Sequence, residues 1–144
     1  MSEPLYTRDI LRLAVSIPHQ QRLEDPHGSA EIRSKTCGSI VAVDVILTNT
    51  ASLKELGLAI NACALGQASA AILGAQAIGQ SMNDIEKARS GLAEFLNGTH
   101  PSPGAWKNID KLIAAKDHRG RHAAILLPYD ALIAAFADAK RKVA

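Results

Sequence analysis

The stretch AEIRSKTCGSIVAVDVIL, residues 30–47, decides the fold that the sequence predicts. Its first five residues alternate between small or apolar side chains and charged ones, which is the pattern of a half-buried strand. Cys37 and Gly38 then interrupt the alternation, as at a turn. From Ile40 to Leu47 the residues are β-branched or apolar on both faces apart from Asp44, which is typical of a central strand.

A third alternating run follows this pair of strands. A polar connection spans residues 48–52, and Leu56, Leu58, Ile60 and Ala62 then recur at every second position. Because the links between the three runs are no longer than turns, we expect an antiparallel meander.

Helical spacing fills the rest of the chain. We expect helices at residues 5–17 and 64–80, then one that a Ser81–Asp84 capping box opens and Asn97-Gly98 ends, and a short one at residues 106–113. A last helix carries Leu132 and Phe136. Its start stays open, because Pro128 suits a first helical turn and is costly deeper inside.

These elements predict an α+β fold. An N-terminal helix precedes a three-stranded antiparallel sheet, and the C-terminal helices pack on one face of that sheet. A chain of 144 residues is expected to form a single domain, residues 1–144.

Composition excludes several classes of function. A net charge of +2 and an aromatic content of 3% argue against nucleic-acid binding. The longest aliphatic runs, such as residues 123–127, are too short to cross a membrane, and no basic segment followed by an apolar one marks a signal peptide. We therefore expect a cytoplasmic protein whose two cysteines are free thiols.

The two cysteines occupy unusual positions. Cys37 lies at the predicted turn between the first two strands, and Cys63 lies at the junction of the third strand and the Ala-rich helix. In a meander both places fall at the same end of the sheet, so the thiols are expected to converge. The start of a helix also favours a thiolate, which would prepare Cys63 as a nucleophile or a soft metal ligand. Two buried, inert thiols are the alternative interpretation.

Three segments carry a resemblance to a known family: Leu5-Tyr6, SKTCG at residues 34–38 and, above all, ACALGQAS at residues 62–69. They resemble the U-type iron–sulfur cluster assembly scaffolds, the NifU N-terminal, IscU and SufU family. The resemblance implies a scaffold that accepts sulfur from a cysteine desulfurase and iron from a donor. Such a protein holds a labile cluster and passes it to acceptor apoproteins.

The family's site consists of three cysteines and an aspartate, which bind a [2Fe–2S] cluster or Zn²⁺. Carried over position by position, Cys37 matches the first cysteine and Cys63 the second, whereas Ser39 replaces the aspartate and Ala124 the third cysteine. His122, two positions before Ala124, is a competent third ligand because imidazole binds zinc and iron in mixed sites. The predicted ligands are therefore Cys37, Cys63 and His122.

Three functions stay open. The first is a cluster scaffold or carrier without enzymatic turnover. The second is a sulfur-accepting partner or regulator of a cysteine desulfurase, which the missing donors favour, and the third is a zinc-binding module. A P-loop, a nucleophile elbow and a dinucleotide fingerprint are absent from the sequence, so we do not expect an enzyme. Because each chain offers only two or three ligands, a homodimer that shares one cluster is also a possible arrangement.

Two further segments have a structural interpretation, and the first of them also has a functional one. The basic loop from Lys116 to His122 is a solvated surface or a docking patch for the desulfurase. Ala68 and Ser69 are expected to be packing and helix-start residues beside Cys63.

Overall fold

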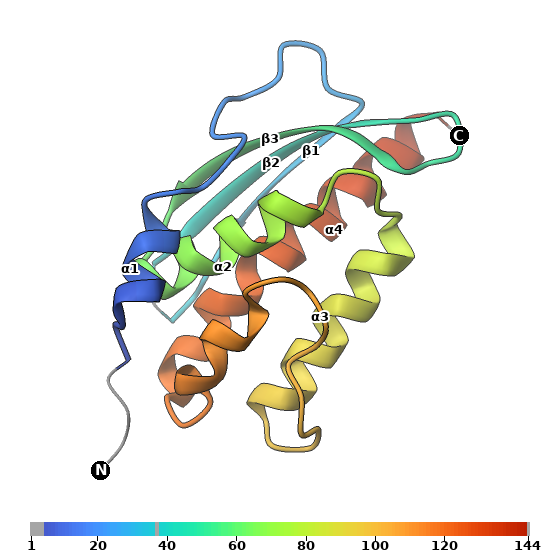
Figure 1. Ribbon diagram of the computed structural model, residues 1–144. Helices are drawn as coiled ribbons and strands as arrows, with labels where there is room; N and C mark the ends of the chain where they lie inside the picture. The colour runs from blue at the N-terminus through green and yellow to red at the C-terminus, as the bar shows by residue number, and fades with distance from the viewer. Residues whose placement is uncertain (1–4, 37, 144) are drawn as a thin grey trace.

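The computed structural model describes residues 5–36 and 38–143, and its elements follow the predicted order (Figure 1). These elements are α1 (Arg8–Ala14), β1 (Gly28–Arg33), β2 (Ile40–Leu47), β3 (Leu53–Asn61), α2 (Ala64–Gln76), α3 (Met82–Leu96), the 3₁₀ helices η1 (Ile109–Ala115) and η2 (Arg119–Arg121), and α4 (His122–Val143). The α+β prediction is confirmed.

The three strands form one antiparallel sheet in the order β1-β2-β3. Val43 of β2 lies opposite Ala30 of β1 and Leu58 of β3, so the alternating apolar residues of all three strands share one face. The helices cover this face: α4 packs on β1 and β2, and α2 packs on α4 (Figure 1). This layer of apolar side chains is the core, as the sequence pattern predicts.

Asp44, the polar exception in β2, belongs to the opposite face of the sheet. Its carboxylate accepts hydrogen bonds from Arg22 (Nε 2.6 Å, Nη2 2.9 Å), from the Ser29 hydroxyl (2.6 Å) and from the backbone N–H of Leu23 (3.0 Å). Arg22 and Leu23 belong to the loop that arches over this face between α1 and β1 (Figure 1). The guanidinium of Arg22 and these donors hold the pKa of Asp44 at about 2, although the side chain is 1% exposed.

Gly28 allows α4 to lie directly on β1. A Cβ at this position would come within 2.4 Å of the Ala135 carbonyl oxygen and 2.4 Å of the Ala139 amide nitrogen. The segment Arg119–Lys142 has the length and apolar composition of a membrane-spanning helix, yet 56% of its most apolar stretch is buried within the protein. Packing against β1, β2, α2 and α3 accounts for that composition.

Two helices are shorter than predicted. The Thr7 hydroxyl accepts a hydrogen bond from the N–H of Ile10 and starts α1 at Arg8 rather than at residue 5. At the other end of the fold, α2 stops at Gln76 instead of residue 80, because Gly79 and Gln80 exchange backbone hydrogen bonds of 2.8 Å with Leu53. Pairing with β2, in which Leu53 lies opposite Leu47, extends β3 back to Leu53, before the predicted start at residue 56.

The expectations for the remaining helices have mixed outcomes. The capping box of Ser81 and Asp84 at the start of α3 is confirmed, and so is the end of α3 before Asn97. The short helix expected at residues 106–113 is the 3₁₀ helix η1. Pro128 lies inside α4, which begins at His122, so the preference for a first-turn proline does not set the start of this helix.

Candidate functional site

One end of the sheet brings together the segments that carry the candidate residues. At this end Ile40 pairs with Arg33 of β1 and with Asn61 of β3. The β1–β2 turn and the junction of β3 with α2 therefore share an end of the sheet, as predicted. Cys37 itself lies outside the described residues, so its proximity to Cys63 stays a prediction.

Cys63 is the N-cap residue of α2. Its backbone is extended (φ −65°, ψ 169°), and its side chain makes no capping hydrogen bond. The thiol is free and half-buried, and the first turn of α2 contains no acidic side chain. Cys63 thus presents a sulfur atom at the positive end of a helix macrodipole, where a soft ligand or a nucleophile is well placed.

The start of α4 lies against the first turn of α2. A Cβ placed on Gly66 would lie 3.3 Å from the carbonyl oxygen of Ala124, 3.7 Å from its Cβ and 2.8 Å from the Cβ of Ala62. Ala124 is 2% exposed and contributes a methyl group there. The position that matches the family's third cysteine is therefore next to the helix that Cys63 caps, but it carries no ligand atom.

The β1–β2 turn also faces α4. Ser34 and Thr36 of this turn line a surface cavity of about 440 Å³ together with Ala123 and Leu127 of α4. Within the turn, the N–H of Ser34 donates to the carbonyl oxygen of Ser39, which is 4% exposed. The Ser39 hydroxyl occupies the aspartate position without a negative charge.

The imidazole of His122 is held by backbone groups. Its Nε2 lies 3.0 Å from the carbonyl oxygen of Ala115 and 2.9 Å from that of Lys116. Because a carbonyl oxygen only accepts, the tautomer that satisfies both contacts carries its proton on Nε2 and a lone pair on Nδ1. Imidazoles that bind metals are commonly held in this way through their second nitrogen.

The complete predicted ligand set is not contained in the described part of the chain. Among residues 5–36 and 38–143, His, Cys, Asp and Glu side chains form no group of three that could hold a metal ion. The set of Cys37, Cys63 and His122 includes a residue outside these ranges, so it stays a prediction.

Ser69 has a role that the sequence analysis missed. It lies within α2 rather than at its start, is fully buried, and donates a 2.6 Å hydrogen bond from its hydroxyl to the carbonyl oxygen of Ile125. The bond joins the helix that Cys63 caps to the first turns of α4. A hydroxyl in an apolar helix was a signal for such a contact, but its partner is distant in sequence.

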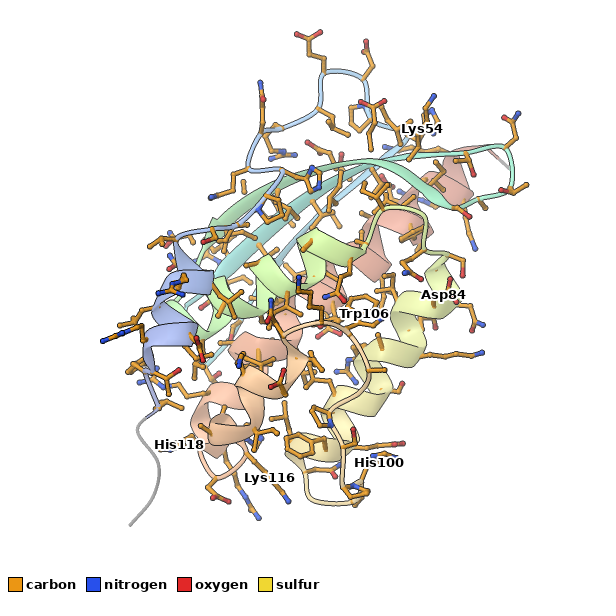
Figure 2. All side chains as sticks on the ribbon, in the orientation of Figure 1. Lys54, Asp84, His100, Trp106, Lys116 and His118 are labelled. Atoms are coloured by element: carbon orange, nitrogen blue, oxygen red, sulfur yellow. The ribbon has the colours of Figure 1, made fainter. Side chains whose placement is uncertain are left out.

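Lys116 of the basic loop contacts an aromatic ring within the protein. The ammonium group of Lys116 lies 5.4 Å from the ring centroid of Phe95, a cation–π contact. In Figure 2, Lys116 and His118 lie at the end of the molecule opposite Lys54. A docking role for this loop stays a prediction.

Two solved structures share this fold. A nitrogen-fixing NifU-like protein (N-terminal part) from Brucella abortus is 27% identical, with a TM-score of 0.86 and 96% of each chain covered. A protein from the thermophile Fervidobacterium islandicum AW-1, assigned as an iron–sulfur cluster assembly scaffold for the SUF system, is 19% identical, with a TM-score of 0.83, covering 92% of this chain and 96% of that one. No protein-family model and no curated protein sequence matches the chain.

Proposed function

This chain belongs to the U-type iron–sulfur cluster assembly scaffolds, and we propose that it carries a labile [2Fe–2S] cluster as cargo for apoproteins in the cytoplasm. The observation that carries the proposal is the position of Cys63. Its free thiol caps α2 at the end of the sheet where the β1–β2 turn and the start of α4 meet. The protein performs no turnover of its own.

Two thiolates and one imidazole hold the cargo in this proposal. Cys37 and Cys63 supply the soft ligands that iron–sulfur clusters prefer. The Nδ1 atom of His122 supplies the third donor, because the Ala115 and Lys116 carbonyls occupy Nε2. One position stays open for a side chain of the recipient or of a second copy of the chain. A site with fewer than four ligands from this chain suits a cluster that is transferred to an apoprotein.

Metal and sulfide analysis tests the proposal directly. Iron, zinc and acid-labile sulfide are measured per chain after reconstitution without oxygen, in wild type, Cys37→Ala, Cys63→Ala and His122→Gln. The glutamine side chain can still donate hydrogen bonds to the two carbonyl oxygens, but it has no metal-binding nitrogen in place of Nδ1. His118→Ala is the matched control, since His118 lies in the same loop and forms no side-chain hydrogen bond within the described ranges.

We expect matched iron and sulfide in wild type and His118→Ala, and loss of both in the two cysteine variants and in His122→Gln. A cluster that persists in His122→Gln contradicts the histidine ligand alone. A wild-type protein that takes up neither iron nor sulfide contradicts the cargo proposal as a whole. Zinc that iron does not displace would instead identify a zinc-binding module.

Sulfur acceptance from a cysteine desulfurase is the second candidate function. The methyl group of Ala124 and the neutral hydroxyl of Ser39 at two ligand positions favour it. The Cys63 thiolate attacks the outer sulfur of the enzyme's cysteine persulfide, so that a new S–S bond forms on Cys63 and the enzyme's S–S bond breaks to leave its thiolate. No net oxidation occurs in this exchange.

Mass spectrometry distinguishes this candidate from cluster carriage. After incubation with a cysteine desulfurase and cysteine, the Cys63 peptide gains one sulfur atom, and Cys63→Ala abolishes the gain. Persulfide formation in a protein that takes up no iron would support sulfur acceptance over the scaffold role.

A further inference from the structure

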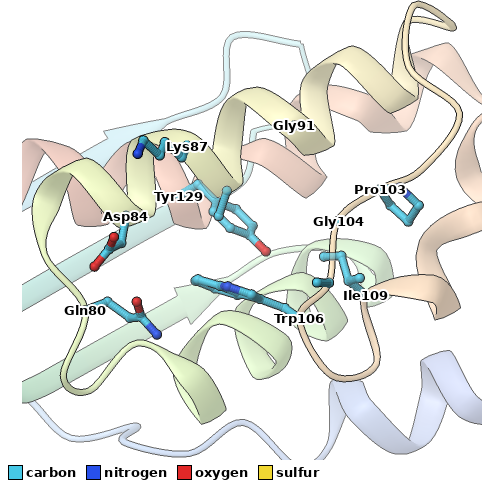
Figure 3. A pocket seen from close by; sticks show the side chains of 11 residues that line it. Gln80, Asp84, Lys87, Gly91, Pro103, Gly104, Trp106, Ile109 and Tyr129 are labelled. Carbon is cyan, nitrogen blue, oxygen red and sulfur yellow. The ribbon is translucent and has the colours of Figure 1, made fainter.

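A cavity of about 300 Å³ lies away from the candidate cluster site, between α3 and the segment that precedes η1 (Figure 3). Ala88 and Gly91 of α3, Gly104 and Trp106 of the preceding segment, and Ile109 of η1 line it with apolar surface. Asp84 and Lys87 add the charged groups of its lining. Its volume is at the lower end of the range for small-molecule pockets.

Tyr129 is part of the cavity wall, and its hydroxyl is a buried polar group there. Tyr129 is 0% exposed, and its oxygen is the buried side-chain atom without a hydrogen-bond partner in the described part of the chain. Figure 3 shows this oxygen directed toward the segment that carries Gly104 and Trp106. Burial raises the pKa of the phenol, so the group stays protonated and available as a donor.

A buried hydroxyl without a hydrogen-bond partner lowers the stability of a fold, so the Tyr129 hydroxyl calls for an explanation. Leaving such a group without a partner costs about 1–3 kcal/mol, and a fold without a use for the oxygen could place phenylalanine here. The ring itself is well packed, because its centroid lies 6.0 Å from that of Trp106 at an interplanar angle of 31°. The oxygen therefore adds to the cavity wall a hydrogen-bond donor that the packing of the tyrosine ring does not require.

We propose that this cavity binds a small aromatic molecule whose carbonyl oxygen accepts a hydrogen bond from Tyr129. The aromatic ring contacts Trp106, Ala88 and Ile109, which form the apolar wall. A cavity of about 150 Å³ already accommodates benzene, so the observed volume is sufficient for a substituted ring. Neither Cys63 nor His122 lines this site, and its occupation does not depend on cluster carriage.

Two probes of nearly the same shape test the proposal on the full chain. Acetophenone has the ring and the carbonyl oxygen, whereas ethylbenzene has the ring alone. Trp106 is the one tryptophan in the chain, so its indole N–H gives a single resonance that reports on the cavity wall during an NMR titration. The variants are Tyr129→Phe, and Tyr6→Phe as the control at the other tyrosine, which is 42% exposed.

Acetophenone should bind wild type and Tyr6→Phe equally and Tyr129→Phe about three- to tenfold more weakly, the loss expected for one hydrogen bond. Ethylbenzene should bind all three proteins with the same affinity. Gly91→Leu should block both probes, because a Cβ at Gly91 meets no atom within 4 Å and the longer side chain fills the cavity.

Three outcomes would overturn the proposal. The first is the absence of a saturable shift with acetophenone, which would leave a water molecule or a partner's side chain as the occupant. The second is equal affinity of acetophenone for wild type and Tyr129→Phe. The third is binding of either probe that persists unchanged in Gly91→Leu.

Discussion

The hydroxyl of Ser69 donates a 2.6 Å hydrogen bond to the carbonyl oxygen of Ile125, and this bond joins the interior of α2 to α4. It lies beside a weak point of α4. Pro128 has no N–H, so the carbonyl of Ala124, four residues earlier, lacks its helical donor. The serine thus stabilises α4 in the turn that places Ala124 against Gly66.

Ser69→Ala should lower the free energy of unfolding by about 1–2 kcal/mol, because the hydroxyl that bonds the buried Ile125 carbonyl is lost. It should also speed loss of a reconstituted cluster, since α2 and α4 both carry candidate ligands. Urea unfolding and the decay of visible absorbance measure the two effects. Ser81→Ala is the control: it removes the cap of α3 at a cost of about 1 kcal/mol and should leave the decay unchanged.

Gly28→Ala should destabilise the protein by about 3 kcal/mol. The added methyl group would meet the backbone of α4 at Ala135 and Ala139, which cannot move aside as a flexible side chain does. Gly91→Ala is the matched substitution, because its Cβ meets no neighbour and its helical position should gain about 0.5–1 kcal/mol. Equal unfolding midpoints for the two variants would contradict the close contact of β1 and α4.

Asp44→Asn should lower the free energy of unfolding by about 2 kcal/mol near neutral pH, since the charged carboxylate accepts four hydrogen bonds. The pKa of Asp44 is lowered from 3.8 to about 2, so its contribution is complete above the unfolded pKa and is lost as the pH falls through the folded one. Urea midpoints of both proteins should therefore converge between about pH 4 and pH 2. Asp117→Asn, at an exposed aspartate, should show no such convergence.

Ala124→Cys combined with Ser39→Asp should slow cluster loss about tenfold or more, since even changes beyond the first ligand shell alter metal affinity by that factor. The new thiol would lie next to the helix that Cys63 caps, where Ala124 now presents a methyl group. Ala137→Cys is the control, because this residue is exposed on the same helix, more than three turns after Ala124. A cluster that decays as fast in the double variant as in wild type would place the ligands elsewhere.

Much of this fold could be predicted because its signals are local. The continuous β-branched and apolar run set the bounds of β2 from Ile40 to Leu47, and the Ser81–Asp84 capping box located the start of α3. The meander also brought the β1–β2 turn to the same end of the sheet as Cys63. Each of these features depends on residues close together in the chain, whose spacing and hydrogen-bonding chemistry can be seen in the sequence.

The tertiary structure alone decided the features that depend on distant residues. Pro128 is tolerated inside α4, Gly28 is required where α4 crosses β1, and the Tyr129 hydroxyl is left unpaired in a cavity. The closeness of Ala124 to Gly66 likewise comes from the packing of two helices that are far apart in sequence. No local pattern encodes these distances, because they result from how complete helices and strands pack against one another.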